Sequence, residues 1–262
     1  MSENHTATVD ILIRFKNSAA TLPRVIEHLE NQTYPPTNII GVDTGSTDGS
    51  AEIIRRAGGT VVSWDAPYSH PKVLNFGLGY CRSELVVVLS SHTVLLSPDT
   101  IERMVAVMAN PAMACVSAKW DDDPYYSDAI SWDEMRAKGL KVGSIYSNSM
   151  GMLRHSFWQA TPFDETMEGS EDYAWAISQL RLGHLCGRMD FPFDYLRSSN
   201  DRHHELARSA FLIARRNGLR PAWLGARCTF QNLIKAVLSG DKEARSLHGE
   251  RLRAWWDVRR GR

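Results

Sequence analysis

Hydrophobic residues in the first 120 positions of this chain follow two alternating patterns. Short apolar runs, such as VDILIRF at 9–15 and LVVVL at 85–89, are typical of buried strands. Between such runs, apolar residues recur at helical spacing, as Leu22, Val25 and Leu29 do. The pattern predicts strands at 9–15, 39–42, 60–64, 85–89 and 114–118, and helices at 18–31, 50–57, 72–81 and from Ser97 onward.

This regular alternation of strands and helices predicts an α/β fold with a largely parallel, doubly wound sheet. The alternation stops after Trp120. Residues 121–149 are polar and rich in Asp, Tyr and Ser, and we interpret them as an irregular insertion beside the functional site. Three more helices are expected, at 171–182, 202–217 and 230–238.

Charge divides the chain into two parts. Residues 202–262 carry 14 Lys and Arg against 5 Asp and Glu, whereas the first 201 residues carry 16 against 25. A basic tail either meets an anionic partner or presents a solvated helical face. The formal net charge of the whole chain is zero, and no nucleic-acid partner is expected. We expect one domain over 1–200, with a nucleotide-binding half at about 9–120 and an acceptor half at about 121–200, and a basic helical extension over 201–262.

The cellular compartment is indicated by the cysteines and by the apolar runs. The four cysteines are Cys81, Cys115, Cys186 and Cys228. None forms a C-x-x-C pair, which argues against a zinc knuckle and favours a reducing compartment. Residues 1–10 are polar, and no apolar run approaches the roughly 18 residues that span a bilayer. We expect a cytoplasmic protein. Residues 252–262 would contact the inner face of the membrane, form a homo-oligomer contact, or be a solvated C-terminus.

Polar residues gather where the predicted strands end. In α/β sheets ligands bind outside the carboxyl ends of the strands, and helix N-termini favour anions. The clusters are Arg14 to Asn17 after the first strand, Asp43 to Asp48 after the second, Ser90 to His92 after the fourth, and Glu171-Asp172 at a helix start. We therefore place the candidate site at this edge of the sheet.

The turn after the second strand has two interpretations. Asp43 ends an apolar run, and Gly45 and Gly49 allow a tight bend. Ser46 and Asp48 can cap the following helix. The turn is either a well-capped connection or part of a ligand site.

Five motifs, taken in chain order, resemble those of the family 2 glycosyltransferases with the GT-A fold. They are R-F-K-N at 14–17, L-E-N-Q-T at 29–33, V-D-T-G-S-T-D-G at 42–49, K-V-L-N-F-G at 72–77, and P-F-D-E at 162–165 with Glu171-Asp172 following. The resemblance covers about 9–187. It implies a Rossmann-like, mostly parallel sheet and a nucleotide-sugar donor. The acceptor would be a hydroxyl of a glycan, a lipid-linked saccharide or a small molecule.

The resemblance also implies which residues hold the donor. Asp43, with the turn behind it, would hold the base and ribose, because a carboxylate accepts hydrogen bonds from base N–H groups and sugar hydroxyls. Lys72 would lie near the diphosphate as a cation. Thr44 stands where the family often has a second acid, so a uracil contact is not carried over. The donor residues we assign are Arg14, Asn17, Asp43, Gly45, Ser46, Asp48, Lys72, Asn75, Ser91 and His92.

Asp172 matches the general base of the family, with Glu171 beside it. In an inverting transfer a base removes the proton of the acceptor hydroxyl as that hydroxyl attacks the anomeric carbon. A helix N-terminus would favour the ionised carboxylate. Two acids in a first helical turn are also common without any function, but the upstream Phe163-Asp164-Glu165 favours the catalytic interpretation.

The chain departs from the family pattern after the fourth predicted strand. The family usually has Asp-x-Asp there, which holds a divalent metal, whereas this chain has Ser90-Ser91-His92. Mg²⁺ prefers carboxylate oxygens, and imidazole suits Mn²⁺ or Zn²⁺ better. Three roles stay open for His92: a metal ligand with His203 or His204, a direct partner of the diphosphate, or a remnant of a lost site. We favour a working site that binds Mn²⁺ or Mg²⁺ weakly or not at all.

Two other functional classes compete with an inverting glycosyltransferase. The missing Asp-x-Asp supports a degenerate nucleotide-sugar-binding or scaffold protein, and the retained Glu171-Asp172 counts against it. A nucleotidyltransferase needs a glycine-rich phosphate loop, and 14–18 is not glycine-rich. Trp120 and Trp132 are candidates for stacking on an acceptor sugar.

Overall fold

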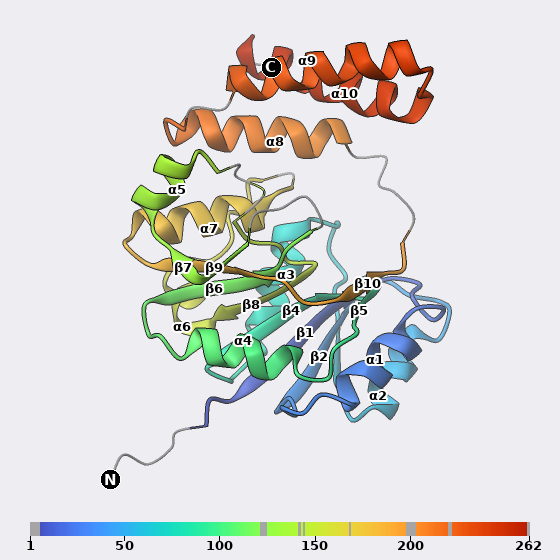
Figure 1. The fold of residues 1–262 in the computed structure, drawn as a ribbon. Helices are drawn as coiled ribbons and strands as arrows, with labels where there is room; N and C mark the ends of the chain where they lie inside the picture. Colours follow the sequence, from blue (N-terminus) through green and yellow to red (C-terminus); the bar gives the residue numbers. More distant parts are fainter. Residues whose placement is uncertain are drawn as a thin grey trace.

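A central sheet of eight strands organises the molecule, and helices cover both of its faces (Figure 1). The computed structural model describes residues 6–120, 125–140, 143, 145–167, 169–197, 203–219 and 222–260. The strands are β1 (Val9–Phe15), β2 (Asn38–Asp43), β3 (Thr60–Ser63), β4 (Leu85–Ser90), β5 (Thr93–Leu95), β6 (Met113–Ala118), β7 (Tyr126–Ile130), β8 (Met150–Arg154), β9 (Leu185–Met189) and β10 (Phe193–Tyr195). The helices are α1 (Leu22–Glu30), α2 (Ser50–Arg56), α3 (His70–Leu78), α4 (Thr100–Met108), α5 (Trp132–Lys138), α6 (His155–Ala160), α7 (Glu171–Arg181), α8 (His203–Arg216), α9 (Ala222–Ser239) and α10 (Lys242–Arg259).

The strand order is β3-β2-β1-β4-β8-β6-β9-β7, and β5 pairs with β10 in a separate antiparallel ribbon. Strands β3, β2, β1 and β4 run parallel, as do β6 and β9, whereas β8 is antiparallel to both of its neighbours. The predicted α/β class and mostly parallel sheet are confirmed. The antiparallel strands β8 and β7 were not predicted by the alternation pattern.

The core forms two layers because side chains alternate along each strand. Leu12 of β1 joins a cluster with residues of α3 and α7 on one face of the sheet. Ile11 and Ile13 join a second cluster with residues of α1, α2 and α4 on the other face. Burying a side chain of this size contributes about 1.5–3 kcal/mol, so the two layers fix the positions of the strand ends.

The interpretation of 121–149 as an irregular insertion is wrong for most of the described residues in it. Residues Tyr126–Ile130 form β7, which pairs with β9 through an irregular register. Helix α5 follows, with a capping box between Ser131 and Glu134. These elements are short, and the bulged pairing of β7 breaks the alternation on which the sequence pattern depends.

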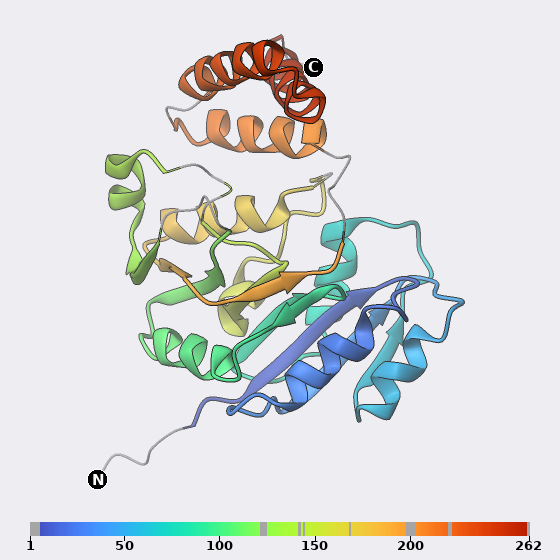
Figure 2. The ribbon, with the colours of Figure 1, turned by 45° about the vertical axis from the view of Figure 1, so that its right-hand side comes forward.

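Three C-terminal helices lie beyond α7, on the side away from the sheet (Figures 1 and 2). Helix α8 buries Ile213 and Ala214, and α10 buries Ala254 and Val258. The arginine Arg215 of α8 donates from Nη1 to the Val258 carbonyl at 2.7 Å. The predicted helical extension is present, and its α10 was not predicted as a separate helix.

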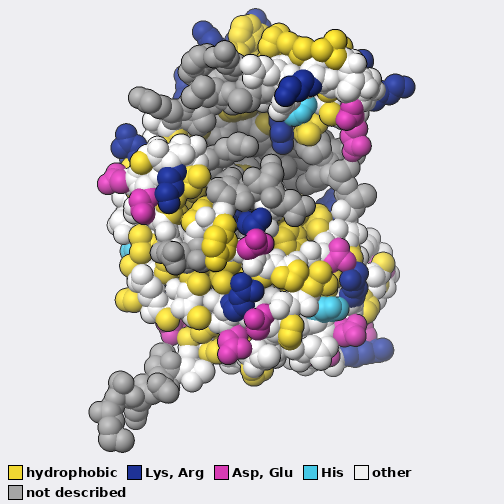
Figure 3. Space-filling view, in the orientation of Figure 1, with side chains coloured by type: hydrophobic (Ala, Val, Ile, Leu, Met, Phe, Trp, Pro, Cys, Tyr) yellow, Lys and Arg dark blue, Asp and Glu magenta, His cyan; other side chains and the backbone are white. Residues whose placement is uncertain are grey.

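Exposed hydrophobic side chains gather on α9, at the top of the view in Figure 3. They include Phe230 and Leu238, with exposed fractions of 55% and 82%. Within the described part of the chain, no helix combines the length and the apolar character needed to cross a bilayer. The membrane or oligomer contact expected for 252–262 stays a prediction.

Candidate active site

A cleft of about 810 Å³ opens at the carboxyl ends of β1 and β4. Residues Arg14, Thr44 and His92 line it from the strand ends, and Asn148, Glu171 and Asp172 line it from the acceptor half. The sheet edge predicted for ligand binding therefore faces the start of α7, where the predicted base lies.

The turn after β2 is a tightly bonded structure. The carboxylate oxygen Oδ1 of Asp43 accepts hydrogen bonds from the Gly45 N–H at 3.1 Å and the Ser46 N–H at 2.8 Å. Gly45 has a φ of 95°, a left-handed conformation that favours glycine. Asp48 accepts from the N–H of Ser50 at 3.1 Å, which holds the start of α2. The capped-connection interpretation is thus correct as a description of the backbone.

The same turn is joined to the loop after β1. Asn17 accepts from the Thr47 N–H at 2.8 Å and donates from its own N–H to Ser46 Oγ at 3.0 Å. Asp48 Oδ2 accepts from the Ala19 N–H at 2.9 Å. Asn17, Ser46 and Asp48 therefore position this corner of the molecule, and Thr44 is the residue of the turn that lines the cleft in the described structure. Nucleoside contacts by Asp43 and its neighbours stay predictions.

The two residues predicted on α3 do not line the cleft. Asn75 uses its whole amide elsewhere: Oδ1 accepts from Trp158 Nε1 at 3.0 Å and from the Phe163 N–H at 3.1 Å. Its Nδ2 donates to the Phe163 carbonyl at 2.9 Å and to Glu165 Oε1 at 3.1 Å. An amide with both oxygen lone pairs and both protons engaged has nothing left for a donor. Lys72 is exposed and outside the cleft lining, so its role stays a prediction.

The imidazole of His92 is held by hydroxyl groups. Its Nε2 lies 2.8 Å from Ser90 Oγ and 3.2 Å from the Tyr195 hydroxyl. Ser91 Oγ lies 3.3 Å from its Nδ1 and 2.9 Å from Ser18 Oγ. The Ser91 side chain is buried between the loops, so Ser90 and His92 are the cleft-lining members of this motif.

Burial, together with the charges of Arg197 and Arg14, lowers the pKa of His92 to about 4. The imidazole is therefore neutral at neutral pH. A neutral imidazole between two cations is a hydrogen-bonding group rather than a charge.

The described residues do not fit a divalent metal. In the described ranges, no three His, Cys, Asp or Glu side chains come together to hold an ion. The Ser-Ser-His segment offers hydroxyls and an imidazole whose Nε2 already has two partners. The side chains of His203 and His204, at the start of α8, lie outside the described residues, and their predicted role as ligands stays a prediction.

Glu171 is a buried acid with two hydrogen-bonding side chains beside it. Its side chain is 2% exposed, and Oε1 lies 2.8 Å from His70 Nδ1 and 3.1 Å from Asn148 Nδ2. Burial raises the pKa of Glu171, but the charge and hydrogen bond of His70 outweigh burial and leave the pKa below its usual value. Glu171 is thus the ionised member of the pair.

Asp172 lines the cleft with its carboxylate fixed by two backbone groups. Its Oδ2 accepts from the Asn148 N–H at 3.0 Å, and its Oδ1 accepts from the Tyr173 N–H at 2.9 Å. Burial, and then the charge of Glu171, raise the pKa of Asp172 to about 7. A carboxylate with a pKa near neutrality is suited to accept a proton and release it again.

Several residues around the cleft were not assigned from the sequence. These are Tyr68, His70, Asn148, Tyr195 and Arg197. Their positions depend on loops that converge from distant parts of the chain, and no local motif marks them. Of the two candidate indoles, Trp120 lines the cleft and packs edge-to-face on Tyr195 at 5.3 Å, whereas Trp132 packs against the core.

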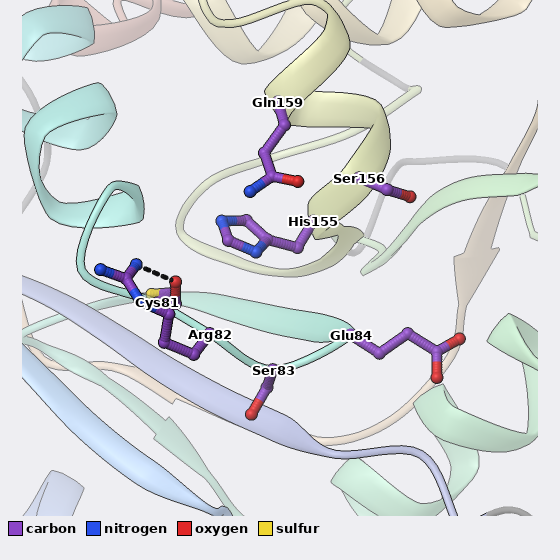
Figure 4. A pocket seen from close by; sticks show the side chains of 7 residues that line it. All are labelled: Cys81, Arg82, Ser83, Glu84, His155, Ser156 and Gln159. Atoms are coloured by element: carbon purple, nitrogen blue, oxygen red, sulfur yellow. Dashed lines mark hydrogen bonds between the residues drawn. The ribbon is translucent and has the colours of Figure 1, made fainter.

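A second cavity, of about 230 Å³, lies at the opposite edge of the sheet, before β4 (Figure 4). Arg82 at its rim donates to the Cys81 carbonyl at 2.7 Å. Burial raises the pKa of Cys81 to about 12, which leaves an inert thiol. The cavity contains none of the predicted site residues.

Residues 10–162 match the model of the family described as "Glycosyl transferase family 2", which is more than half of the chain. The chain belongs to glycosyl transferase family 2. The resemblance inferred from the five motifs is therefore confirmed.

Two curated relatives illustrate the range of the family. An O-antigen chain rhamnosyltransferase of Salmonella typhimurium is 21% identical over 194 residues, which cover 67% of this chain and 62% of the relative. A cholesterol galactosyltransferase of Borreliella burgdorferi is 33% identical over 116 residues, which cover 42% of this chain and 30% of the relative. The chain thus spans less than two thirds of the length of each of these two relatives.

Solved structures share the fold at low identity. A mannosyltransferase of Pyrobaculum calidifontis, solved with GDP-mannose and Mn²⁺, has a TM-score of 0.69 and 16% identity over 97% of this chain and 87% of that chain. Glucosyl-3-phosphoglycerate synthase of Mycobacterium tuberculosis, solved with Mn²⁺ and UDP, has a TM-score of 0.57 and 16% identity over 82% of this chain and 81% of that one. Both support the GT-A fold of this family 2 member.

Proposed function

We propose that this chain transfers a sugar, with inversion, from a nucleoside diphosphate sugar to a hydroxyl acceptor, and that Asp172 is the general base. Membership of family 2 supports the reaction class. The names of the relatives, which transfer rhamnose, galactose and mannose, support a nucleotide-sugar donor. The acceptor class is a glycan, a lipid-linked saccharide or a small molecule with a free hydroxyl.

The observation that carries the proposal is the placement of Asp172. The carboxylate lines the cleft, and two backbone N–H groups hold it in one orientation. Each carboxylate oxygen has a second lone pair, so the acceptor hydroxyl has an available partner. A pKa of about 7 lets the ionised form be populated at neutral pH and still bind the transferred proton.

The transfer step exchanges one bond at the anomeric carbon for another. The acceptor oxygen forms a bond to the anomeric carbon, and the bond from that carbon to the diphosphate oxygen breaks. The electron pair of the broken bond stays on the diphosphate. The proton of the acceptor hydroxyl moves to Asp172, which releases it to solvent after the product leaves.

Substituting Asp172→Asn tests the base directly. We expect the rate of sugar transfer to fall about 10²–10⁴-fold, because an amide does not accept the proton, while donor affinity stays within about 2-fold. A panel of UDP-, GDP- and dTDP-sugars in a product-release assay, with calorimetry for donor binding, measures both quantities. Asp133→Asn is the matched control, because Asp133 is an exposed first-turn acid of α5 outside the cleft.

The degenerate-binder alternative gives a different result in the same assay. If the wild-type chain binds a nucleoside diphosphate but releases no sugar from any donor, the chain is a binding protein and the proposed transfer is wrong. Near-normal turnover of Asp172→Asn would contradict only the assignment of the base.

A further inference from the structure

Three cationic side chains converge on the end of the cleft next to His92. Arg14 is the penultimate residue of β1, Lys16 directly follows the strand, and Arg197 comes after β10; all three line the cleft. In the described part of the chain, no carboxylate lies within ion-pair distance of any of them. The acids that line the described cleft, Glu171 and Asp172, belong to the start of α7 rather than to the strand ends.

Hydrogen bonds position Arg14 and His92 in this part of the cleft. Arg14 Nη1 donates to the Tyr68 hydroxyl at 2.6 Å, and its guanidinium lies 5.7 Å from the centre of the Tyr68 ring. The Tyr195 hydroxyl lies 3.2 Å from His92 Nε2. The charges of Arg14 and Arg197 act on both His92 and Tyr195, and both guanidiniums line the cleft together with these two residues.

A divalent cation would be unfavourable in that volume. Like charges repel, and in a partly buried site the repulsion at short range amounts to several kcal/mol. No carboxylate there offsets the repulsion in the described structure, and hard cations require oxygen ligands of that kind. An anion with several oxygens has the opposite preference, because guanidinium groups bind phosphate through paired, charge-assisted hydrogen bonds.

We propose that Arg14 and Arg197 bind the diphosphate of the donor directly, in the place where the family's Asp-x-Asp motif would hold a metal. Lys16 adds a third positive charge at the rim, and neutral His92 contributes a hydrogen bond. As the bond to the anomeric carbon breaks, negative charge grows on the leaving diphosphate, and preorganised cations stabilise that charge. This inference rests on the proposed function for the identity of the donor.

The test measures binding rather than turnover. The intact chain is titrated by calorimetry with UDP, GDP, dTDP and inorganic pyrophosphate, in EDTA and again in MnCl₂. We expect at least one nucleoside diphosphate to bind in EDTA with an affinity within about 3-fold of that in Mn²⁺. Arg14→Gln and Arg197→Gln should each weaken that binding about 10-fold or more, since a hydrogen bond to a charged group is worth that much.

Two further variants separate charge from geometry. Arg197→Lys keeps the positive charge but loses the forked donor, so we expect a loss smaller than that of Arg197→Gln. Arg55→Gln is the matched control, because Arg55 is an exposed arginine of α2 whose ion pair is with Glu52. Its affinity should equal that of the wild type. Circular dichroism of each variant checks that the fold is retained.

The outcomes distinguish this inference from the proposed function. Binding that is abolished by EDTA, restored by Mn²⁺ and unchanged in both glutamine variants would overturn the guanidinium site and leave the transfer proposal standing. Absence of binding for every probe in both conditions would overturn it as well. EDTA-resistant binding that depends on both arginines, with no sugar released from any donor, would support the diphosphate site and contradict the transfer.

Discussion

The two ends of the cleft apply the same physical rule to groups of opposite sign. At one end, burial and the cations Arg197 and Arg14 lower the pKa of His92 to about 4. At the other end, burial and the anion Glu171 raise the pKa of Asp172 to about 7. In both cases burial and a like charge favour the neutral form. The cleft thus holds a neutral hydrogen-bonding group among cations and a proton acceptor beside an anion.

The ends differ in how their charges are balanced. Glu171 has His70 at 2.8 Å as a hydrogen-bond partner. Arg14 and Arg197 have no carboxylate partner in the described structure, so the charge that balances them would come from a ligand. At the acidic end, Glu171 already has its hydrogen-bond partner in the free protein. At the cationic end, Arg14 and Arg197 would gain an anionic partner when the donor binds.

The largest expected effect comes from removing both guanidiniums. In Arg14→Gln/Arg197→Gln we expect kcat/KM for transfer to fall by about 10²–10⁴-fold, because two charge-assisted contacts to the diphosphate are lost. Steady-state kinetics at fixed ionic strength measures the loss. A double variant no worse than either single variant would show that only one arginine contacts the donor, and the two-cation description of this end would be wrong.

A smaller effect is expected from neutralising Glu171. In Glu171→Gln the like charge beside Asp172 is removed, so the pKa of Asp172 falls and the base is ionised at lower pH. Because the ionised form is the active one, the acidic limb of the kcat/KM profile should move to lower pH by about one unit. Profiles between pH 5 and pH 9 measure the shift, and an unchanged limb would show that Asp172 does not control it.

Stability should respond to Asp172 in a defined pH window. The pKa of Asp172 is raised in the folded state from 3.8 to about 7, so the folded chain binds a proton more tightly than the unfolded chain does. This group therefore costs stability as the pH rises from about 4 through about 7. Asp172→Asn should be more stable than the wild type at pH 8 by about 1–2 kcal/mol, with the advantage gone below pH 4. Urea unfolding at both pH values measures the difference, and a pH-independent difference would contradict the raised pKa.

The smallest expected effect on donor binding comes from substituting Asn75. Its amide joins α3 to the Phe163 loop and does not line the cleft. Asn75→Ala should lower the free energy of unfolding by about 1–3 kcal/mol, because buried partners lose their hydrogen bonds. Donor affinity in calorimetry should stay within about 2-fold. A loss of donor affinity in a well-folded variant would show that Asn75 contributes to donor binding.

The parts of the fold predicted from sequence are those specified by local patterns. The run 9–15 corresponds to β1, and the Asp43 turn has the glycine conformations that its sequence favours. Strand β8 was missed because Gly151 and Arg154 interrupt its apolar run, although the strand is buried along its whole length. Gly151 within it fits only as glycine, since an added Cβ would lie 2.4 Å from the Tyr146 ring, a constraint that no local pattern reveals.

The candidate site shows the same division. Asp172 and His92 line the cleft as their positions at element ends predicted. Asn75 and Ser91, equally well placed in the sequence, are engaged in structural hydrogen bonds. Asn148 and Arg197 were missed because their role depends on loops that meet only in three dimensions. The position of a residue at a strand end predicts that it lies near the cleft. Its hydrogen bonds determine whether its side chain is available to bind a ligand.

The serine hydroxyls behind His92 have a consequence for proton positions. Ser18 Oγ lies 2.9 Å from Ser91 Oγ, which lies 3.3 Å from Nδ1 of the imidazole. The hydroxyls at the two ring nitrogens can each donate or accept, so either tautomer of His92 finds partners without any heavy atom moving. A single imidazole can then present either a proton or a lone pair to whatever occupies the cleft, a versatility that a pair of metal-bound carboxylates lacks.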